Sequence, residues 1–323
     1  MLGSLPFASP TAGDLLANPA ASPAFLPTLG GSGALLLASL GPLLAASRGS
    51  EQGVVLRRRW ATWAAIAPLY LLAVLSGPAV AALFAAALSV QAAREYAALV
   101  GLAPAYRRAL LVAAPLPALA ALLGPAAWAA LPTLLLLVGT LLPLLRADVR
   151  AGMRQLALAA FGWAYLPWLL SYLVLLQRDV AGGPEWLVAL GLAVALADVG
   201  AYVAGRRFGR RRLAPAISPH KTWAGVLGSL LGATLGLALA AWSSLSGPGG
   251  ALLAPEASRL LALALLVAGG ATWGDLVESL LKREHGAKDA GTWLPGFGGL
   301  LDRIDSLVLV LPLAYYALRG GVV

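Results

Sequence analysis

Long apolar stretches separated by short polar segments dominate the sequence. A perpendicular helix needs roughly 20 residues to cross a bilayer, and ten stretches reach or approach that length. They cover residues 31–47, 60–77, 78–94, 107–124, 126–145, 154–176, 184–204, 221–243, 257–280 and 304–319. The first is the weakest, because it contains a mid-span proline and many small residues. The pattern predicts an all-α protein, a polytopic membrane helical bundle of about nine to ten transmembrane helices.

The composition supports a chain that is solvated by lipid. Hydrophobic residues make up 60% of the sequence and charged residues 11%, with a mean hydropathy of +0.82. A soluble domain carries about 25% charged residues, so this chain cannot cover a globular surface with polar groups. The absence of cysteine excludes disulfides, thiolate metal sites and cysteine nucleophiles, and the presence of only two histidines excludes a histidine-rich metal site.

Basic residues divide unevenly between the two ends of the predicted spans. Of the segments that join successive spans, the odd-numbered ones hold 20 of the 23 lysines and arginines. These are Arg48, Arg57, Arg58, Arg59, Arg94, Arg107, Arg108, Arg146, Arg150, Arg154, Arg206, Arg207, Arg210, Arg211, Arg212, Lys221, Lys282, Arg283, Lys288 and Arg303. The positive-inside rule places these segments in the cytoplasm and both termini outside. The net charge of +9 therefore reflects topology and does not indicate nucleic acid.

Several acidic residues lie inside the predicted spans or at their cytoplasmic ends. A charge near the bilayer centre costs at least about 2.5–3.5 kcal/mol, so such residues usually face the bundle interior and have a function there. Asp198 lies in the seventh span. Asp275, Glu278, Ser279 and Lys282 follow at i, i+3, i+4 and i+7 and share one helix face, while Asp302 and Asp305 are spaced i, i+3. A structural ion pair between Glu278 and Lys282 is the alternative, but it does not account for the other acids.

The segment from Asp275 to Asp305 is a polar island that also contains five glycines. Clustered carboxylates with few histidines suit a hard cation such as Mg²⁺. Lysine and arginine interleaved with glycine suit phosphate oxygens, because glycine lets backbone N–H groups approach closely. The segment therefore predicts a polyphosphate–metal substrate at the cytoplasmic membrane face. Neither a GxxxxGK[ST] nor a GxGxxG motif is present, which excludes a P-loop and a Rossmann site.

The seventh joining segment reads GRRFGRRRLAPAISPHKTWAG and contains five arginines. We expect Ser218 or Pro219 to begin the next helix, and a helix N-terminus is a site for anions. The alternative is a basic cytoplasmic loop with an ordinary helix cap.

These two segments together resemble a known family. The residues from Ser279 to Asp305, with Lys282-Arg283, Lys288-Asp289, Leu294-Pro295-Gly296-Phe297-Gly298-Gly299 and Asp302-Arg303 at fixed spacing, resemble the signature of phosphatidate cytidylyltransferase, also called CDP-diacylglycerol synthase. The residues from Asp198 to Gly209 and from Ile217 to Trp223 match the pattern of the same family, and Glu95-Tyr96 resembles a smaller family feature. Phe297 stands where the family usually has His, and Ala224 where it usually has Glu.

The resemblance implies a nucleotidyltransferase of phospholipid biosynthesis that converts CTP and phosphatidate into CDP-diacylglycerol and pyrophosphate. Asp275 and Asp302 are the first choice as Mg²⁺ ligands, supported by Asp305, Asp289 and Glu278. Triphosphate binding is expected from Lys288, Lys282, Arg283 and Arg303, and phosphate binding from the opposite wall by Ser218, Pro219, Lys221, Thr222 and Arg206. Asp198 and Tyr202 are expected to support the site. A second, monovalent cation beside Mg²⁺ is left open.

The hydropathy pattern and the resemblance also predict how the chain is divided, what it binds and where it is located. Residues 1–30 are expected to be a flexible tail without the basic region of a signal peptide, 31–180 to be N-terminal transmembrane helices, and 181–323 to be the catalytic transmembrane region with cytoplasmic loops. The partners are CTP, phosphatidate and the bilayer, with a homodimer implied by resemblance alone. The location is a bacterial-type cytoplasmic (inner) membrane, with the site facing the cytoplasm.

Three alternatives stay open at this point. The chain could be a divergent family member that acts on another lipid phosphate, or one without activity. It could also be an ion-coupled membrane transporter, because intramembrane carboxylates mark cation paths as well.

Overall fold

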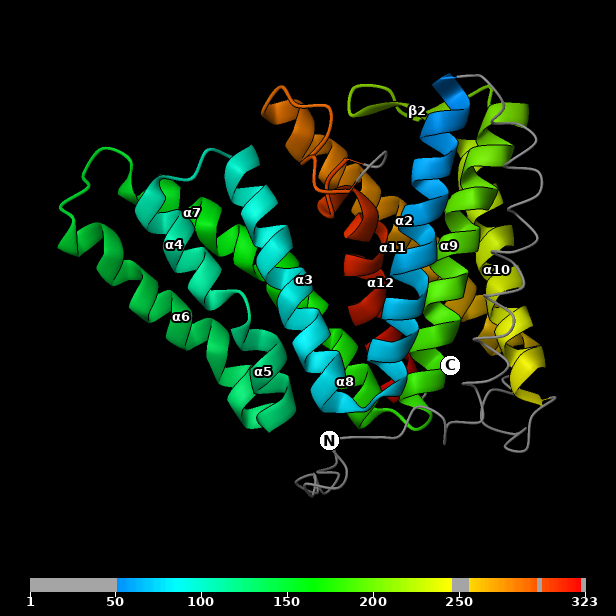
Figure 1. The fold of residues 1–323 in the computed structure, drawn as a ribbon, viewed down its shortest axis with the longest axis horizontal. Coiled ribbons are helices and arrows are strands. Elements are labelled where there is room, and N and C mark those ends of the chain that lie inside the picture. Colours follow the sequence, from blue (N-terminus) through cyan, green and yellow to red (C-terminus); the bar gives the residue numbers. More distant parts are fainter. Residues whose placement is uncertain (1–50, 246–255, 295–297, 321–323) are drawn as a thin grey trace.

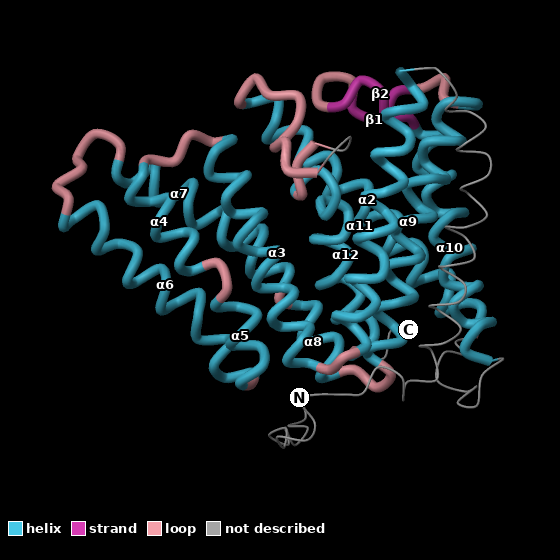
Figure 2. The backbone as a smooth tube through the Cα atoms, in the orientation of Figure 1, coloured by secondary structure: helices cyan, strands magenta, loops and turns pink. Residues whose placement is uncertain are grey.

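A computed structural model describes residues 51–245, 256–294 and 298–320 of the 323-residue chain. The predicted tail (1–30), the predicted first span (31–47) and Phe297 lie outside the described residues. Within them the regular structure is helical apart from one short hairpin and an isolated bridge between Leu294 and Gly298 (Figures 1 and 2), so the all-α prediction is confirmed.

The N-terminal half of the described chain forms seven α-helices and one π-helical turn. They are α2 (Glu51–Leu75), α3 (Pro78–Leu99), α4 (Pro104–Ala113), α5 (Leu116–Leu123), α6 (Pro125–Leu145), α7 (Gly152–Trp163), the π-helix η3 (Ala164–Trp168) and α8 (Tyr172–Asp179). Two predicted spans are interrupted here. Pro115 lies between α4 and α5, and Pro167 lies within η3. A proline removes a backbone donor and its ring clashes with the preceding turn, which explains both interruptions.

The C-terminal half contains the longest helices and the hairpin. Its elements are α9 (Gly183–Phe208), β1 (Arg212–Ala214), β2 (Ser218–Thr222), α10 (Trp223–Leu245), α11 (Ala257–Glu284) and α12 (Leu301–Arg319). In the described residues, six helical segments are long and apolar enough to cross a membrane: Pro104–Leu123, Pro125–Leu145, Gly152–Asp179, Gly183–Phe208, Trp223–Trp242 and Ala257–Glu284. This supports a polytopic membrane protein, while the number of nine to ten spans stays a prediction.

Helices α9 and α10 pack closely because glycines line the contact between them. A Cβ on Gly228 would lie 2.5 Å from the side chain of Ala204, and one on Gly236 would lie 2.6 Å from the Cα of Ala193. Small residues allow two membrane helices to approach backbone to backbone. In Figure 1 this pair stands beside α11, α12 and α2, while α4, α5, α6 and α7 form the other side of the bundle.

The expectation that a helix begins at Ser218 or Pro219 is wrong. Both residues belong to β2, which pairs antiparallel with β1 through Arg212 opposite Thr222 and Ala214 opposite Ser218. A residue before proline is disfavoured in helical conformation, which keeps Ser218 extended. The helix begins at Trp223, and the hydroxyl of Thr222 caps it by accepting the N–H of Gly225 at 3.1 Å.

The segments rich in basic residues gather at one end of the bundle. The hairpin, the loop between α11 and α12, the α3–α4 turn and the α6–α7 loop all lie at the upper end in Figure 2, whereas the α8–α9 turn lies at the lower end. This arrangement agrees with the charge asymmetry of the sequence.

Candidate active site

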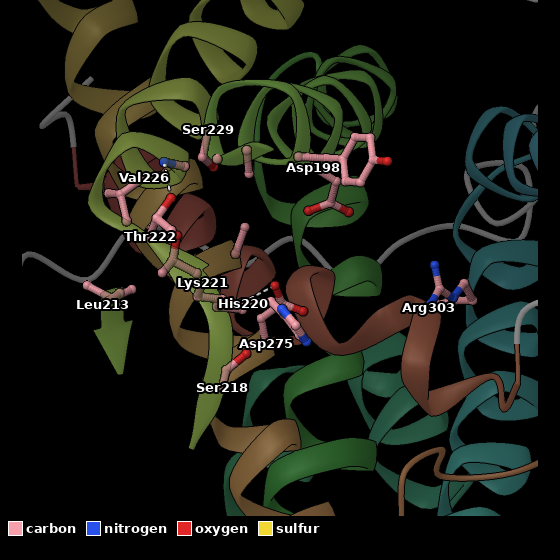
Figure 3. A pocket seen from close by; sticks show the side chains of 16 residues that line it. Asp198, Leu213, Ser218, His220, Lys221, Thr222, Val226, Ser229, Asp275 and Arg303 are labelled. Atoms are coloured by element: carbon pink, nitrogen blue, oxygen red, sulfur yellow. Dashed lines mark hydrogen bonds and ion pairs between the residues drawn. The ribbon is translucent and has the colours of Figure 1, made fainter. Parts of the chain in front are cut away.

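A cavity of about 370 Å³ lies between α9, the hairpin, α10, α11 and α12. Its polar lining combines residues of both resembling segments with Ser229 and Thr272 (Figure 3). The residues are Asp198, Tyr202, Ser218, His220, Lys221, Thr222, Ser229, Thr272, Asp275 and Arg303. Cations and carboxylates from segments far apart in the sequence therefore meet around one space.

An ion pair between Lys221 of β2 and Asp275 of α11 crosses this cavity. Behind it, the carboxyl group of Asp305 on α12 lies close to that of Asp275. Gly274 makes this approach of α11 and α12 possible, because a Cβ there would lie 3.3 Å from the Cα of Ser306 and collide with the carbonyl of Asp305. Acids from two different spans therefore lie together here, but the pair that the sequence favoured was Asp275 and Asp302, and Asp302 does not line the cavity.

Asp198 connects α9 to the same group of acids. Its carboxylate accepts a hydrogen bond from the hydroxyl of Ser306 at 3.5 Å, and its side chain opens into the cavity. The position suits the bracing role expected for it. Tyr202, one turn further along α9, also lines the cavity, and its hydroxyl accepts a hydrogen bond from Arg206 at 2.7 Å.

Lys282 holds a second pair of carboxylates together. Its ammonium group lies 2.6 Å from Oε2 of Glu278 and 2.7 Å from Oδ1 of Asp302. Both acids are buried. The Glu278–Lys282 ion pair that the sequence offered as an alternative therefore exists, but Lys282 also joins α11 to α12. In this conformation its charge is shared between two protein carboxylates.

Asp302 folds the glycine-rich loop onto the start of α12. Its Oδ2 atom accepts the backbone N–H groups of Ala290 at 3.0 Å and Gly299 at 2.8 Å. The sequence predicted that N–H groups of this loop would face phosphate. These two face a protein carboxylate instead, because a closed loop must satisfy its own buried donors.

Glu95 of α3 is the residue that the sequence reasoning left without a role. Its two carboxylate oxygens accept the N–H groups of Leu300 at 3.0 Å and Leu301 at 2.8 Å. The side chain is buried, and Gly291 and Gly299 pack against it so closely that a Cβ on either would clash with its carboxyl group. The available signal in the sequence was that Glu95 is a carboxylate within a strongly apolar helix and belongs to the family-like Glu95-Tyr96 pair.

The cavity thus gathers some of the predicted site residues and not others. Those that line it are Asp198, Tyr202, Ser218, Lys221, Thr222, Asp275 and Arg303. Those placed elsewhere are Arg206, Pro219, Glu278, Lys282, Arg283, Lys288, Asp289, Asp302 and Asp305. Of the latter, Asp305 lies behind Asp275, and Asp302 binds the glycine-rich loop next to Arg303. The side chains of Arg283, Lys288 and Asp289 are exposed near that loop. Ala224 is half-buried at the start of α10.

In the described part of the chain, two neighbouring carboxyl groups, not a larger cluster, are the oxygen donors that the site offers to Mg²⁺. Among the described residues, no group of three or more His, Cys, Asp or Glu side chains is arranged to hold a metal ion. Mg²⁺ is, however, usually held by one or two carboxylates together with substrate phosphates and water. The adjacent carboxyl groups of Asp275 and Asp305 fit that pattern, and Oε1 of Glu278 is buried without a hydrogen-bond partner. Both carboxylate oxygens of Asp302 already bind protein donors. Its role as a metal ligand therefore stays a prediction.

The sequence of the chain matches a known protein family over most of its length. The profile described as "Cytidylyltransferase family" matches residues 57–320, which is most of the chain. The chain belongs to the cytidylyltransferase family. The match covers α3 to α12 and every described residue of the site.

Curated relatives within this group share the name suggested by the motifs. The chain is 43% identical over 143 residues to a phosphatidate cytidylyltransferase of Brucella suis (44% of this chain, 50% of the relative). It is 40% identical over 134 residues to a phosphatidate cytidylyltransferase of Pseudomonas aeruginosa (40% and 47%). It is also 36% identical over 164 residues to the uncharacterized protein YnbB of Escherichia coli (49% and 52%). The chain spans about half the length of the curated relatives it matches.

Proposed function

We propose that this cytidylyltransferase-family protein transfers the cytidylyl group of CTP to phosphatidate, giving CDP-diacylglycerol and pyrophosphate. The observation that carries the proposal is the cavity in which Lys221, Asp275 and Arg303 meet from three different elements. All three lie within the family match. Phosphatidate cytidylyltransferase is also the name of relatives that are 40–43% identical over nearly half of this chain.

The reaction asks the protein to bring two polyanions together. A phosphate oxygen of phosphatidate attacks the α-phosphorus of CTP, a new P–O bond forms, and the bond to the β-phosphate oxygen breaks as pyrophosphate leaves. The lipid phosphate is already ionised, so no protein nucleophile is needed. Catalysis then depends on positioning and on neutralising charge.

The residues of the cavity suit these two tasks. Lys221 and Arg303 place positive charge on two sides of the cavity, where phosphate groups of both substrates would bind. Asp275 keeps Lys221 in place until a phosphate competes for it. We propose that Asp275 and Asp305 hold Mg²⁺ together with substrate phosphates; when bound, the ion would supply charge neutralisation at the triphosphate.

The location of the cavity supports a cytoplasmic origin for CTP. The hairpin supplies part of the cavity lining, and it lies at the end of the bundle where the other basic segments gather (Figure 2). By the positive-inside rule we propose that this end faces the cytoplasm, in a bacterial-type inner membrane. A lipid phosphate in the inner leaflet would then reach the cavity from the level of the headgroups.

The test uses purified protein in detergent with radiolabelled CTP, phosphatidate and Mg²⁺, followed by chromatography of the lipid fraction. Labelled CDP-diacylglycerol is expected, and it should require both substrates. Asp275→Asn should form none while its melting profile remains cooperative. A folded wild-type protein that labels no lipid would overturn the proposal. Labelling of a different lipid phosphate alone would identify a divergent activity, and CTP-independent cation flux into proteoliposomes would identify a transporter.

A further inference from the structure

Glu95 approaches the candidate site from a part of the chain that supplies none of the cavity lining. It lies on α3, 205 residues before its hydrogen-bond partner Leu300. The residues that line the cavity begin at Asp198. Its carboxylate is nevertheless buried against the loop and the first turn of α12.

The contacts of Glu95 satisfy the free donors at the start of a helix. The first N–H groups of a helix have no partner within the helix, and negative charge is favourable there. The side chain provides one oxygen for each of two consecutive donors, Leu300 at 3.0 Å and Leu301 at 2.8 Å. Gln91, one turn earlier on α3, donates to Oε1 at 2.9 Å and fixes the orientation of the carboxylate.

The glycines of the loop serve this contact. A Cβ on Gly291 would lie 2.9 Å from Cδ of Glu95, and one on Gly299 would lie 2.5 Å from Oε2 of the same side chain. Both distances are too short for a real Cβ, so the loop closes over the carboxylate only with glycine at these positions. Two of the five glycines that the sequence associated with phosphate are thus needed for an internal carboxylate.

The first turn of α12 carries the groups that act at the cavity. Arg303 follows Leu301 by two residues and lines the cavity, and Asp305 lies two residues further along, beside Asp275. A shift of this turn would move both groups relative to Lys221. Asp302 fastens the other side of the same loop through Ala290 and Gly299.

We propose that Glu95 is a positioning residue, which holds the start of α12 from α3 so that Arg303 faces the cavity and Asp305 supports Asp275 from behind, at the distances that the reaction requires. The expected effect on turnover rests on the proposed cytidylyl transfer, whereas the expected effect on the position of α12 does not. It also means that the region 181–323 is incomplete without α3. Misplacing a catalytic group by about 1 Å can cost roughly a hundredfold in rate.

The test compares Glu95→Gln, Glu95→Asp and the neighbouring Tyr96→Phe in the full-length protein. Gln keeps the shape but offers one acceptor oxygen for two donors, whereas Asp keeps both oxygens on a shorter side chain. We expect kcat to fall roughly a hundredfold in Glu95→Gln with a small change in KM for CTP, and to fall less in Glu95→Asp. Tyr96→Phe, on the same helix as Glu95, loses the 2.8 Å hydrogen bond that the Tyr96 hydroxyl donates to the carbonyl of Leu158 on α7, and should keep its kcat.

Amide hydrogen exchange, read by mass spectrometry on peptides that span Leu300 and Leu301, gives a measurement without turnover. Protection of these amides should be lost in Glu95→Gln and kept in Tyr96→Phe. Loss of protection with an unchanged kcat, or unchanged protection, would overturn the positioning role. If the wild type forms no CDP-diacylglycerol while Glu95→Gln still loses protection, the proposed reaction is wrong. The structural role of Glu95 at the start of α12 is then still supported.

Discussion

Lys282 is a position where the structure predicts a large effect of one substitution on stability. Its ammonium group is the shared partner of Glu278 and Asp302, and the side chains of the three residues are only 16%, 3% and 5% exposed. Lys282→Met keeps much of the volume but leaves two buried carboxylates without their cation. Removing one partner of a buried ion pair costs about 3–5 kcal/mol.

Lys221→Met is the matched comparison. The side chains of Lys221 and Asp275 are 22% and 37% exposed, so water compensates the remaining charge, and the pair is worth about 1 kcal/mol or less. In a thermal melt in detergent, roughly 2–4 °C is expected for each kcal/mol in a large domain. Lys282→Met should therefore melt on the order of 10 °C lower, and Lys221→Met no more than about 4 °C lower. The activity of Lys221→Met should nevertheless fall sharply, because its charge faces the cavity.

A second substitution tests the cause of the instability. Adding Glu278→Gln to Lys282→Met removes one of the two uncompensated charges, so about 0.5–3 kcal/mol should return. The reasoning is refuted if Lys282→Met melts within about 2 °C of wild type. It is also refuted if the double variant is no more stable than the single one.

Three further predictions concern other parts of the molecule. Gly228→Leu should lower the melting temperature steeply, because a Cβ there already meets Ala204 at 2.5 Å; a melt close to wild type would contradict the close contact of α9 and α10. Gly274→Val should abolish labelling of lipid, because the added side chain would push α11 away from α12 at Asp305. Full activity in the same assay would contradict that packing. Tyr172→Phe should cost about 1 kcal/mol of stability through loss of its 2.7 Å bond to Tyr316, with turnover unchanged; a loss of turnover would show that this distant end of the bundle affects the site.

The fold could be predicted from sequence wherever a local pattern decides it. Apolar runs of span length gave the positions of the helices from α2 to α12, because a helix in lipid satisfies its own backbone hydrogen bonds. The breaks at Pro115 and Pro167 were not predicted as breaks, since a membrane helix tolerates proline to a degree that depends on its neighbours. The hairpin was missed because pairing between β1 and β2 depends on contacts across a turn.

The candidate site divides in the same way. Helical spacing alone placed Asp275, Glu278 and Lys282 on one face, and the ion pair between the last two was the alternative interpretation that the spacing offered. The sharing of Lys282 with Asp302 was not, because it depends on how α11 and α12 pack. The assignment of metal ligands and substrate contacts stays a prediction.

The sequence by itself determined that this chain forms apolar helices with a basic end, and that its acids and cations fall in two family-like segments. The tertiary structure decided which of those groups meet and what they bind. Lys221 meets Asp275 across the cavity, while Glu95 binds the start of α12 from 205 residues away. The physical reason is range: helix formation and charge patterning are properties of neighbouring residues, whereas a buried carboxylate finds its donors only after distant helices pack.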